Sequence, residues 1–216
     1  MNVEKLIQVK MPLVREQVVN ILREAILMRE LNAGDPLNIN DLSMKLGVSA
    51  TPIREALQVL ESDGLVCIKP RRGAVVADID EKYIRDYYQT RIILECAAVQ
   101  MACAEGKDLT ALLKNFQKME LAVQNSEHVD YGSLNYSFHA TIWSICGNER
   151  IKRLLESFWI SRSISAHHDS EQNAKTSFQE HKEIMEAVVA RNAERAGVAM
   201  QKHLERSMDD VLSHFI

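Results

Sequence analysis

Three histidines and one amide are spaced so that separate helices could bring them to a single metal ion. Asn135 and His139 lie four residues apart, which places an amide oxygen and an imidazole on the same face of a helix. His181 falls at the start of a later expected helix, and His203 lies in the middle of the last one. Imidazole nitrogens with one oxygen donor suit a divalent transition metal. The alternative is that each histidine is an ordinary core residue with satisfied hydrogen bonds, because spacing on separate helices does not prove convergence.

A charged pair stands in an otherwise apolar stretch of the chain. Arg91 and Glu95 are four residues apart, so they share one face of the helix expected there. The guanidinium of Arg91 has the forked geometry that binds a carboxylate through two hydrogen bonds, and Glu95 could orient it. This pattern predicts that both residues bind a small organic-acid effector. The alternative is a buried Arg91–Glu95 pair that serves only the fold.

Polar side chains also gather near a tight glycine turn in the first third of the chain. Gly47 separates two short amphipathic segments, and the second begins at Ser49 with Pro52 in its first turn. Free N–H groups at a helix start suit a phosphate, and an arginine on the outer face can read guanine in the major groove. We expect DNA contacts from Ser49, Thr51, Arg54, Gln58, Lys69, Arg71 and Arg72. The alternative for a single residue such as Arg54 is a solvated surface position.

Turn residues and apolar spacing predict the elements that position the DNA-contacting groups. A first helix begins after Pro12, and a short helix from Asp41 is capped by Asn40. A third helix is capped by Ser49 and ended by Gly64, and two strands follow at 65–68 and 74–77. Residues 32–36 form only a turn. This order of helices and hairpin is the layout of a winged helix-turn-helix.

The rest of the chain is expected to be entirely helical, because no proline follows Pro70. Helices are predicted at 80–104, 108–124, 128–145, 149–166, 177–191 and from 192 almost to the end. The first of them should be central and buried, and a capping-box pattern at Ser177 starts or restarts the fifth. The fold class is therefore mainly α. A winged helix-turn-helix domain with a small β-hairpin wing spans 1–77, and a bundle of six or seven helices spans 78–216.

Composition and charge narrow the class of protein. The 216 residues are 46% hydrophobic and 26% charged, which suits one large or two small globular domains and excludes a disordered tail or a disulfide-stapled miniprotein. The net charge of −4 does not exclude DNA binding, because residues 1–78 carry ten basic and ten acidic side chains and the whole excess follows them. No apolar run reaches the about 18 residues of a membrane span. The cysteines lack CxxC spacing, so we expect reduced thiols and a cytoplasmic protein with no membrane partner.

The N-terminal motif resembles the GntR family of bacterial regulators. It comprises VSATPIREAL at 48–57, LESDGLV at 60–66 and RGAVV at 72–76. The resemblance covers about residues 10–77 and implies a DNA-binding winged helix-turn-helix. Ala50 stands where the family usually has arginine, and Asn40 stands where a basic residue is common. Both positions contact DNA in related proteins, so we expect a different operator preference or a greater dependence on Arg54, Arg71 and Arg72.

Residues 80–216 resemble the helical ligand-sensing FCD domain of the FadR subfamily. The matching pieces are RIILE at 91–95, FH at 138–139, GN at 147–148, EHKEI at 180–184 and MQKHL at 200–204. The resemblance implies a divalent metal, held by one aspartate and three histidines beside a small carboxylate. Carried over, the ligands are Asn135, His139, His181 and His203. Asn135 replaces the usual aspartate, which leaves the full charge of the ion to attract an anionic effector. Zinc fits these ligands best, and nickel or another late divalent metal is the alternative.

These features predict a dimeric bacterial transcription regulator that is not an enzyme. The first domain would bind a two-fold operator in double-stranded DNA. A small organic acid, with metal assistance, would shift the spacing of the two recognition helices and change operator affinity. Two alternatives stay open at this point: a histidine-rich metalloenzyme with an appended DNA-binding module, and a regulator whose signal is the metal itself. No HExxH motif supports the enzyme.

Overall fold

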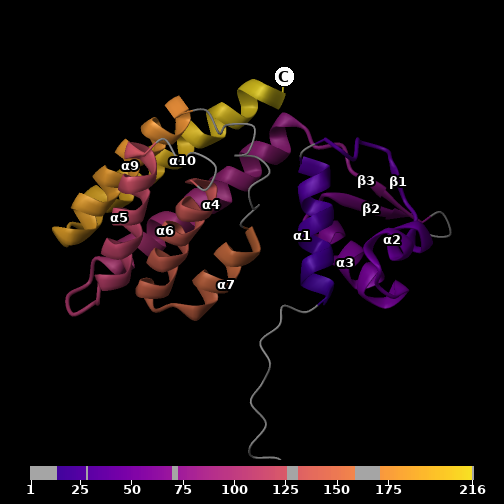
Figure 1. The fold of residues 1–216 in the computed structure, drawn as a ribbon, viewed down its shortest axis with the longest axis horizontal. Helices are drawn as coiled ribbons and strands as arrows, with labels where there is room; N and C mark the ends of the chain where they lie inside the picture. The colour runs from indigo at the N-terminus through magenta and orange to yellow at the C-terminus, as the bar shows by residue number, and fades with distance from the viewer. Residues whose placement is uncertain (1–13, 28, 70–72, 126–130, 159–170, 216) are drawn as a thin grey trace, which may run out of the picture. The chain divides into compact units, whose positions relative to one another are not determined.

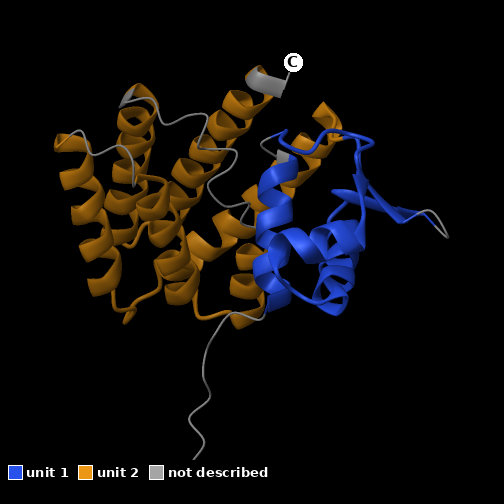
Figure 2. Cartoon of the chain, turned by 45° about the vertical axis from the view of Figure 1, so that its right-hand side comes forward, with its two compact units in different colours: residues 1–78 blue, residues 79–216 orange. Residues whose placement is uncertain are grey.

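The computed structural model describes residues 14–27, 29–69, 73–125, 131–158 and 171–215 (Figure 1). The chain divides into two compact units, Met1–Asp78 and Ile79–Ile216 (Figure 2). The boundary predicted from the sequence lies one residue earlier. Each unit buries its own set of apolar side chains.

The first unit combines three helices with a small antiparallel sheet. Its elements are α1 (Val14–Leu27), β1 (Pro36–Leu37), α2 (Ile39–Leu46), α3 (Ala50–Ser62), β2 (Val66–Lys69) and β3 (Gly73–Val76) (Figure 1). The strand order is β1-β3-β2, so β3 pairs on both sides. The helix α3 packs against α1 and fully buries Ile53 and Leu60. The winged helix-turn-helix predicted from the sequence is confirmed.

An asparagine and a glycine determine where the short helix α2 begins and ends. Gly47 ends it with left-handed backbone, at φ 65°, which glycine adopts without steric cost. The prediction that Asn40 caps this helix is wrong. The cap is Asn38, which has extended backbone and a side-chain oxygen that accepts hydrogen bonds from the N–H groups of Asn40 and Asp41. Because that oxygen satisfies two free N–H groups, the helix starts at Ile39 and Asn40 falls inside its first turn.

The strand β1 occupies residues that the sequence assigned to a turn and its flank. Its two residues pair with β3, with Pro36 opposite Val75 and Leu37 opposite Ala74. A strand of two residues is too short to show an alternating pattern of apolar and polar side chains. It exists because β3 offers it a partner, and this long-range pairing is invisible in the local sequence.

The second unit is a helical bundle. Its described helices are α4 (Glu81–Ala102), α5 (Thr110–Gln124), α6 (Tyr131–Cys146), α7 (Glu149–Phe158), α9 (Glu171–Val189) and α10 (Ala193–Phe215) (Figure 1). The helix α4 lies along α10 and also contacts α6, α7 and α9. Trp143, Phe138, Met119 and Met200 are among the fully buried core residues. The all-helical bundle is confirmed, and no helix within the described ranges has the length and apolar character of a membrane span.

Two details of the bundle differ from the sequence prediction. Ser177 lies inside α9 and not at its start, because Ala174, Ser177 and Phe178 are all buried and the helix extends upstream to Glu171. The helix α4 is central but not buried on nearly all sides, since Ile93 is 70% exposed. The predicted helix start at 128 and helix end at 166 lie outside the described residues.

Candidate functional site

Three buried histidines meet inside the second unit. His139 comes from α6, His181 from α9 and His203 from α10, and one ligand nitrogen of each lies within 4.8 Å of the others. The Nε2 atoms of His139 and His181 are 3.3 Å apart. Two nitrogens held 2.0–2.1 Å from a tetrahedral ion are separated by about the same distance, 3.3–3.4 Å. The sequence prediction that these helices bring the three histidines together is therefore matched by the geometry.

Each of these imidazoles is oriented by a hydrogen bond at its other nitrogen, Nδ1. The pairs are His139 with Glu95 Oε2 at 3.1 Å, His181 with the Tyr131 hydroxyl at 3.2 Å, and His203 with Glu180 Oε2 at 2.7 Å. An ionised carboxylate can only accept, so His139 and His203 donate from Nδ1 and keep the Nε2 lone pair. Partners of this kind fix the tautomer and ring direction of metal-ligating histidines. The carboxylate partners thus direct Nε2 of His139 and of His203 toward the cluster, as a divalent metal requires.

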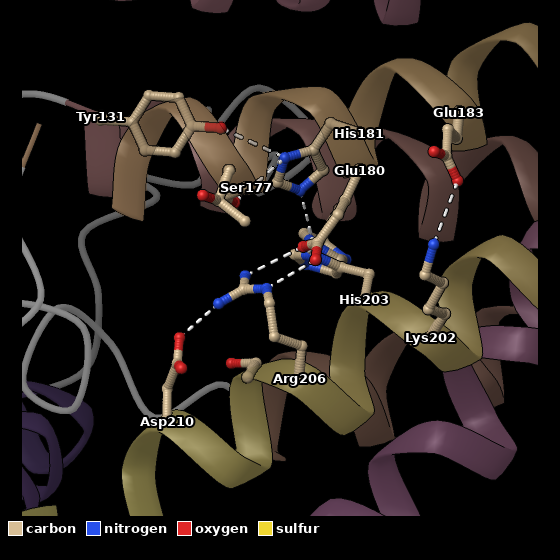
Figure 3. A network of polar contacts seen from close by, with 12 residues as sticks. Tyr131, Ser177, Glu180, His181, Glu183, Lys202, His203, Arg206 and Asp210 are labelled. Carbon is tan, nitrogen blue, oxygen red and sulfur yellow. Dashed lines mark hydrogen bonds and ion pairs between the residues drawn. The ribbon is translucent and has the colours of Figure 1, made fainter. Parts of the chain in front are cut away.

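Each orienting carboxylate is itself held by an arginine. Arg91 Nε donates to Glu95 Oε1 at 3.2 Å, which places an ion pair behind His139. Arg206 binds Glu180 through two nitrogens, with Nε to Oε1 at 2.6 Å and Nη2 to Oε2 at 2.9 Å (Figure 3). Two Arg–Glu–His chains therefore approach the histidine cluster from different helices.

Burial keeps His181 and His203 neutral at neutral pH, and the contacts described above keep the carboxylates of Glu95 and Glu180 charged. Burial lowers the pKa of His203 to about 4 against the opposing effect of Glu180, and burial with the neighbouring imidazoles puts the pKa of His181 well below its ordinary value. Burial would raise the pKa of Glu95, but His139, Arg91 and Trp143 outweigh it and lower that pKa to about 2. Neutral imidazole is the form that binds a metal, so His181 and His203 have the protonation state of metal ligands at neutral pH.

A polar cavity adjoins the histidine cluster. Its lining residues include Arg91, Asn135, Asn173, Ser177, His203, Arg206, Ser207 and Asp210. The Oδ1 atom of Asn135 is buried and makes no hydrogen bond with the described part of the chain, an uncommon situation for a buried oxygen. A cavity volume of about 80 Å³ admits about five to eight water-sized groups. An amide oxygen in this position is a suitable fourth ligand.

The two predicted effector residues, Arg91 and Glu95, lie in different surroundings. Arg91 is 9% exposed and lines the cavity. Glu95 is fully buried and does not line the cavity; it accepts hydrogen bonds from His139 and from the Trp143 indole, at 2.7 Å from the latter. The structure thus contains the buried Arg91–Glu95 pair of the second alternative, and the effector role of Arg91 stays a prediction.

Sequence reasoning missed the second arginine–carboxylate pair. The available signal was the spacing along α10, because His203, Arg206 and Asp210 lie three and four residues apart on one helical face. Glu180, the shared partner of His203 and Arg206, comes from α9, 26 residues before Arg206. No local pattern shows that these two helices align.

The first unit presents a polar helix face suited to DNA. Thr51, Arg54 and Gln58 are exposed and recur at helical spacing on α3, and Ser49 precedes them at the N-cap with no side-chain capping bond. Lys69 is exposed at the end of β2. The other two predicted contacts, Arg71 and Arg72, lie outside the described residues.

The fold and these sites define a winged helix-turn-helix protein of the DNA-binding type with a second, all-helical unit. The chain belongs to the GntR family of bacterial regulatory proteins, whose model matches residues 14–76, and an FCD domain matches residues 86–206. It is 30% identical to the transcriptional regulator YdhC of Bacillus subtilis, over 89% of this chain and 88% of that one. It is 26% identical to the transcriptional repressor RspR of Escherichia coli, over 92% and 89%. The E. coli McbR/YncC structure shares the fold with a TM-score of 0.74 at 19% identity, covering 95% and 100%. The chain is a DNA-binding transcription regulator of GntR–FCD type and not an enzyme.

Proposed function

We propose that this regulator responds to a small organic acid that binds beside a divalent metal in the FCD unit. The observation that carries the proposal is the convergence of His139, His181 and His203, each oriented through Nδ1 by a separate partner. The buried Oδ1 of Asn135 completes the ligand set. Three imidazoles and one neutral oxygen fit zinc, and nickel or another late divalent metal would compete for the same ligands.

The cavity beside this cluster suits a small anion. A bound divalent ion would supply a positive charge that no ligand in the set neutralises, because Asn135 and the histidines are uncharged. Arg91 reaches the same cavity, so we assign it to the effector carboxylate. Glu95 supports this role indirectly, by holding Arg91 and His139. The small volume favours a short organic acid over a long acyl chain.

On the DNA side, we propose that a homodimer in the cytoplasm binds a two-fold operator in double-stranded DNA. Ser49 and Thr51 would meet phosphate at the start of α3, while Arg54 and Gln58 would face base edges. Lys69, Arg71 and Arg72 would reach the flanking backbone from the hairpin. Effector binding would favour one spacing of the paired recognition helices, and so change operator affinity.

Elemental analysis of the purified protein tests the metal site. We expect about one late divalent ion per chain in the wild type and in Lys202→Ala, which changes an exposed neighbour of His203. A variant carrying His139→Ala and His203→Ala should hold none. If the folded wild type neither contains nor takes up zinc or nickel, the metal part of the proposal is wrong.

Operator binding by fluorescence anisotropy then tests the signal. Short hydroxy, oxo and dicarboxylic acids should shift operator affinity of the metal-loaded protein. Arg91→Met, loaded to the same metal content as the wild type, should lose that shift. If the metal alone produces the full shift and no acid adds to it, the metal is the signal and the effector proposal fails.

A further inference from the structure

Resting on the proposed metal site, we infer that Glu180 and Arg206 are positioning residues that set the metal affinity of His203. Neither residue is a ligand in that proposal. They form a side-chain link between α9 and α10 that ends on the Nδ1 atom of His203 (Figure 3). The link continues to Asp210, which pairs with Arg206 one turn further along α10.

The geometry at Glu180 shows why this carboxylate controls the imidazole. It accepts hydrogen bonds from His203 Nδ1 at 2.7 Å and from two nitrogens of Arg206, at 2.6 and 2.9 Å. Three donors leave the carboxylate little freedom to rotate, so the His203 ring is fixed as well. Because the charged carboxylate can only accept, it holds the proton of His203 on Nδ1 and leaves Nε2 for the metal.

Burial along the link decreases steadily with distance from the metal ligand. The exposed side-chain fractions are 5% at His203, 13% at Glu180, 27% at Arg206 and 32% at Asp210. The inner hydrogen bonds are therefore shielded from bulk water, which leaves a charge-assisted bond stronger than at the surface. The outer pair lines the cavity and anchors the inner one.

A neighbouring ion pair provides a matched control. Glu183 lies three residues after Glu180 on α9 and pairs with Lys202, which directly precedes His203 on α10 (Figure 3). It therefore also joins α9 to α10. Its side chains are 55% and 70% exposed, and the pair does not contact the histidine cluster through the bonds drawn there. A general effect of removing an α9–α10 ion pair would appear in Glu183→Gln, whereas a positioning effect would not.

The test is the zinc affinity of the full-length protein, measured by competition with a chromophoric chelator. Substitution of a residue that hydrogen-bonds a metal ligand typically weakens metal binding about 10–100-fold. We therefore expect a loss of this size in Glu180→Gln and none in Glu183→Gln. Arg206→Met should also weaken binding, and the double variant should lose no more than the stronger single variant, because Arg206 acts through Glu180. Arg206→Lys keeps the charge but not the two-point contact, so it should restore binding only in part.

Two further readouts separate positioning from a loss of structure. The visible absorption of bound Co²⁺ reports coordination geometry and should change in Glu180→Gln but not in Glu183→Gln. In metal-free protein, imidazole ¹⁵N shifts should show His203 protonated on Nδ1 in the wild type and as a mixture of tautomers in Arg206→Met. Wild-type zinc affinity and spectra in a folded Glu180→Gln variant would overturn this inference while leaving the metal site intact. Absence of metal binding in the wild type would overturn both.

Discussion

Acidification from pH 7 to pH 5 should destabilise the metal-free FCD unit through its buried histidines. Burial lowers the pKa of His203 to about 4 in the folded protein from its ordinary value of 6.5, so the unfolded chain binds more protons between these two values. Stability therefore falls as the pH falls through this window. For His203 alone the loss between pH 7 and pH 5 is about 2 kcal/mol. His181 is shifted in the same direction and adds to it.

The carboxylates act in a different range. The pKa of Glu95 is lowered to about 2 from 4.5, so its contribution to stability is present above pH 4.5 and is lost only below that value. The loss of stability between pH 7 and pH 5 therefore reports on His181 and His203 and not on Glu95.

Urea unfolding of chelator-treated protein, followed by tryptophan fluorescence, measures this loss. Both tryptophans, Trp143 and Trp159, follow residue 78, so the signal reports the second unit alone. His203→Gln should remove about 2 kcal/mol of the difference between the two pH values. If wild type and His203→Gln lose equal stability on acidification, the burial argument for His203 is refuted.

Three further outcomes are expected. Arg54→Ala should weaken specific operator binding by about 1–3 kcal/mol, and an unchanged affinity in anisotropy titrations would remove its base-reading role. Asn135→Asp adds a full negative charge to the ligand set, so chelator competition should show at least a roughly tenfold gain in zinc affinity (about 1.4 kcal/mol), and no gain would argue that Asn135 is not a ligand. Gly47→Ala places a side chain at φ 65° and should destabilise the first unit by about 1–2 kcal/mol in thermal unfolding; full wild-type stability would contradict the backbone assignment.

The sequence was most informative where structure depends on local residues. Gly47 needs left-handed backbone, and α3 shows its buried face directly in the spacing of Ile53, Leu57 and Leu60. The error at Asn40 arose because two asparagines compete for one capping position and the backbone geometry of Asn38 settles the choice. Such choices depend on the path of the preceding loop, which composition does not record.

The candidate site shows the opposite limit. His139, His181 and His203 could be proposed from residue type, yet their convergence depends on how α6, α9 and α10 align in three dimensions. The roles of Glu180 and Arg206 depend on that alignment even more strongly, because a carboxylate on one helix must meet two donors on another. Tertiary packing also explains why α9 begins at Glu171, upstream of the capping pattern at Ser177. The burial of Ala174 stabilises this extra turn more than the local capping pattern favours a start at Ser177.

With a metal in the proposed site, the origin of the histidines on three helices would have a consequence for the lifetime of the protein. His139 and His181 are 42 residues apart in the chain, so an ion bound between them would act as a reversible cross-link that closes a long loop. Ligand binding to the folded state alone adds about 2.7 kcal/mol at a hundredfold excess over the dissociation constant. In a cell short of the metal, the regulator would then unfold more often and be degraded faster. Metal supply could thus control how many copies exist, apart from what each copy senses.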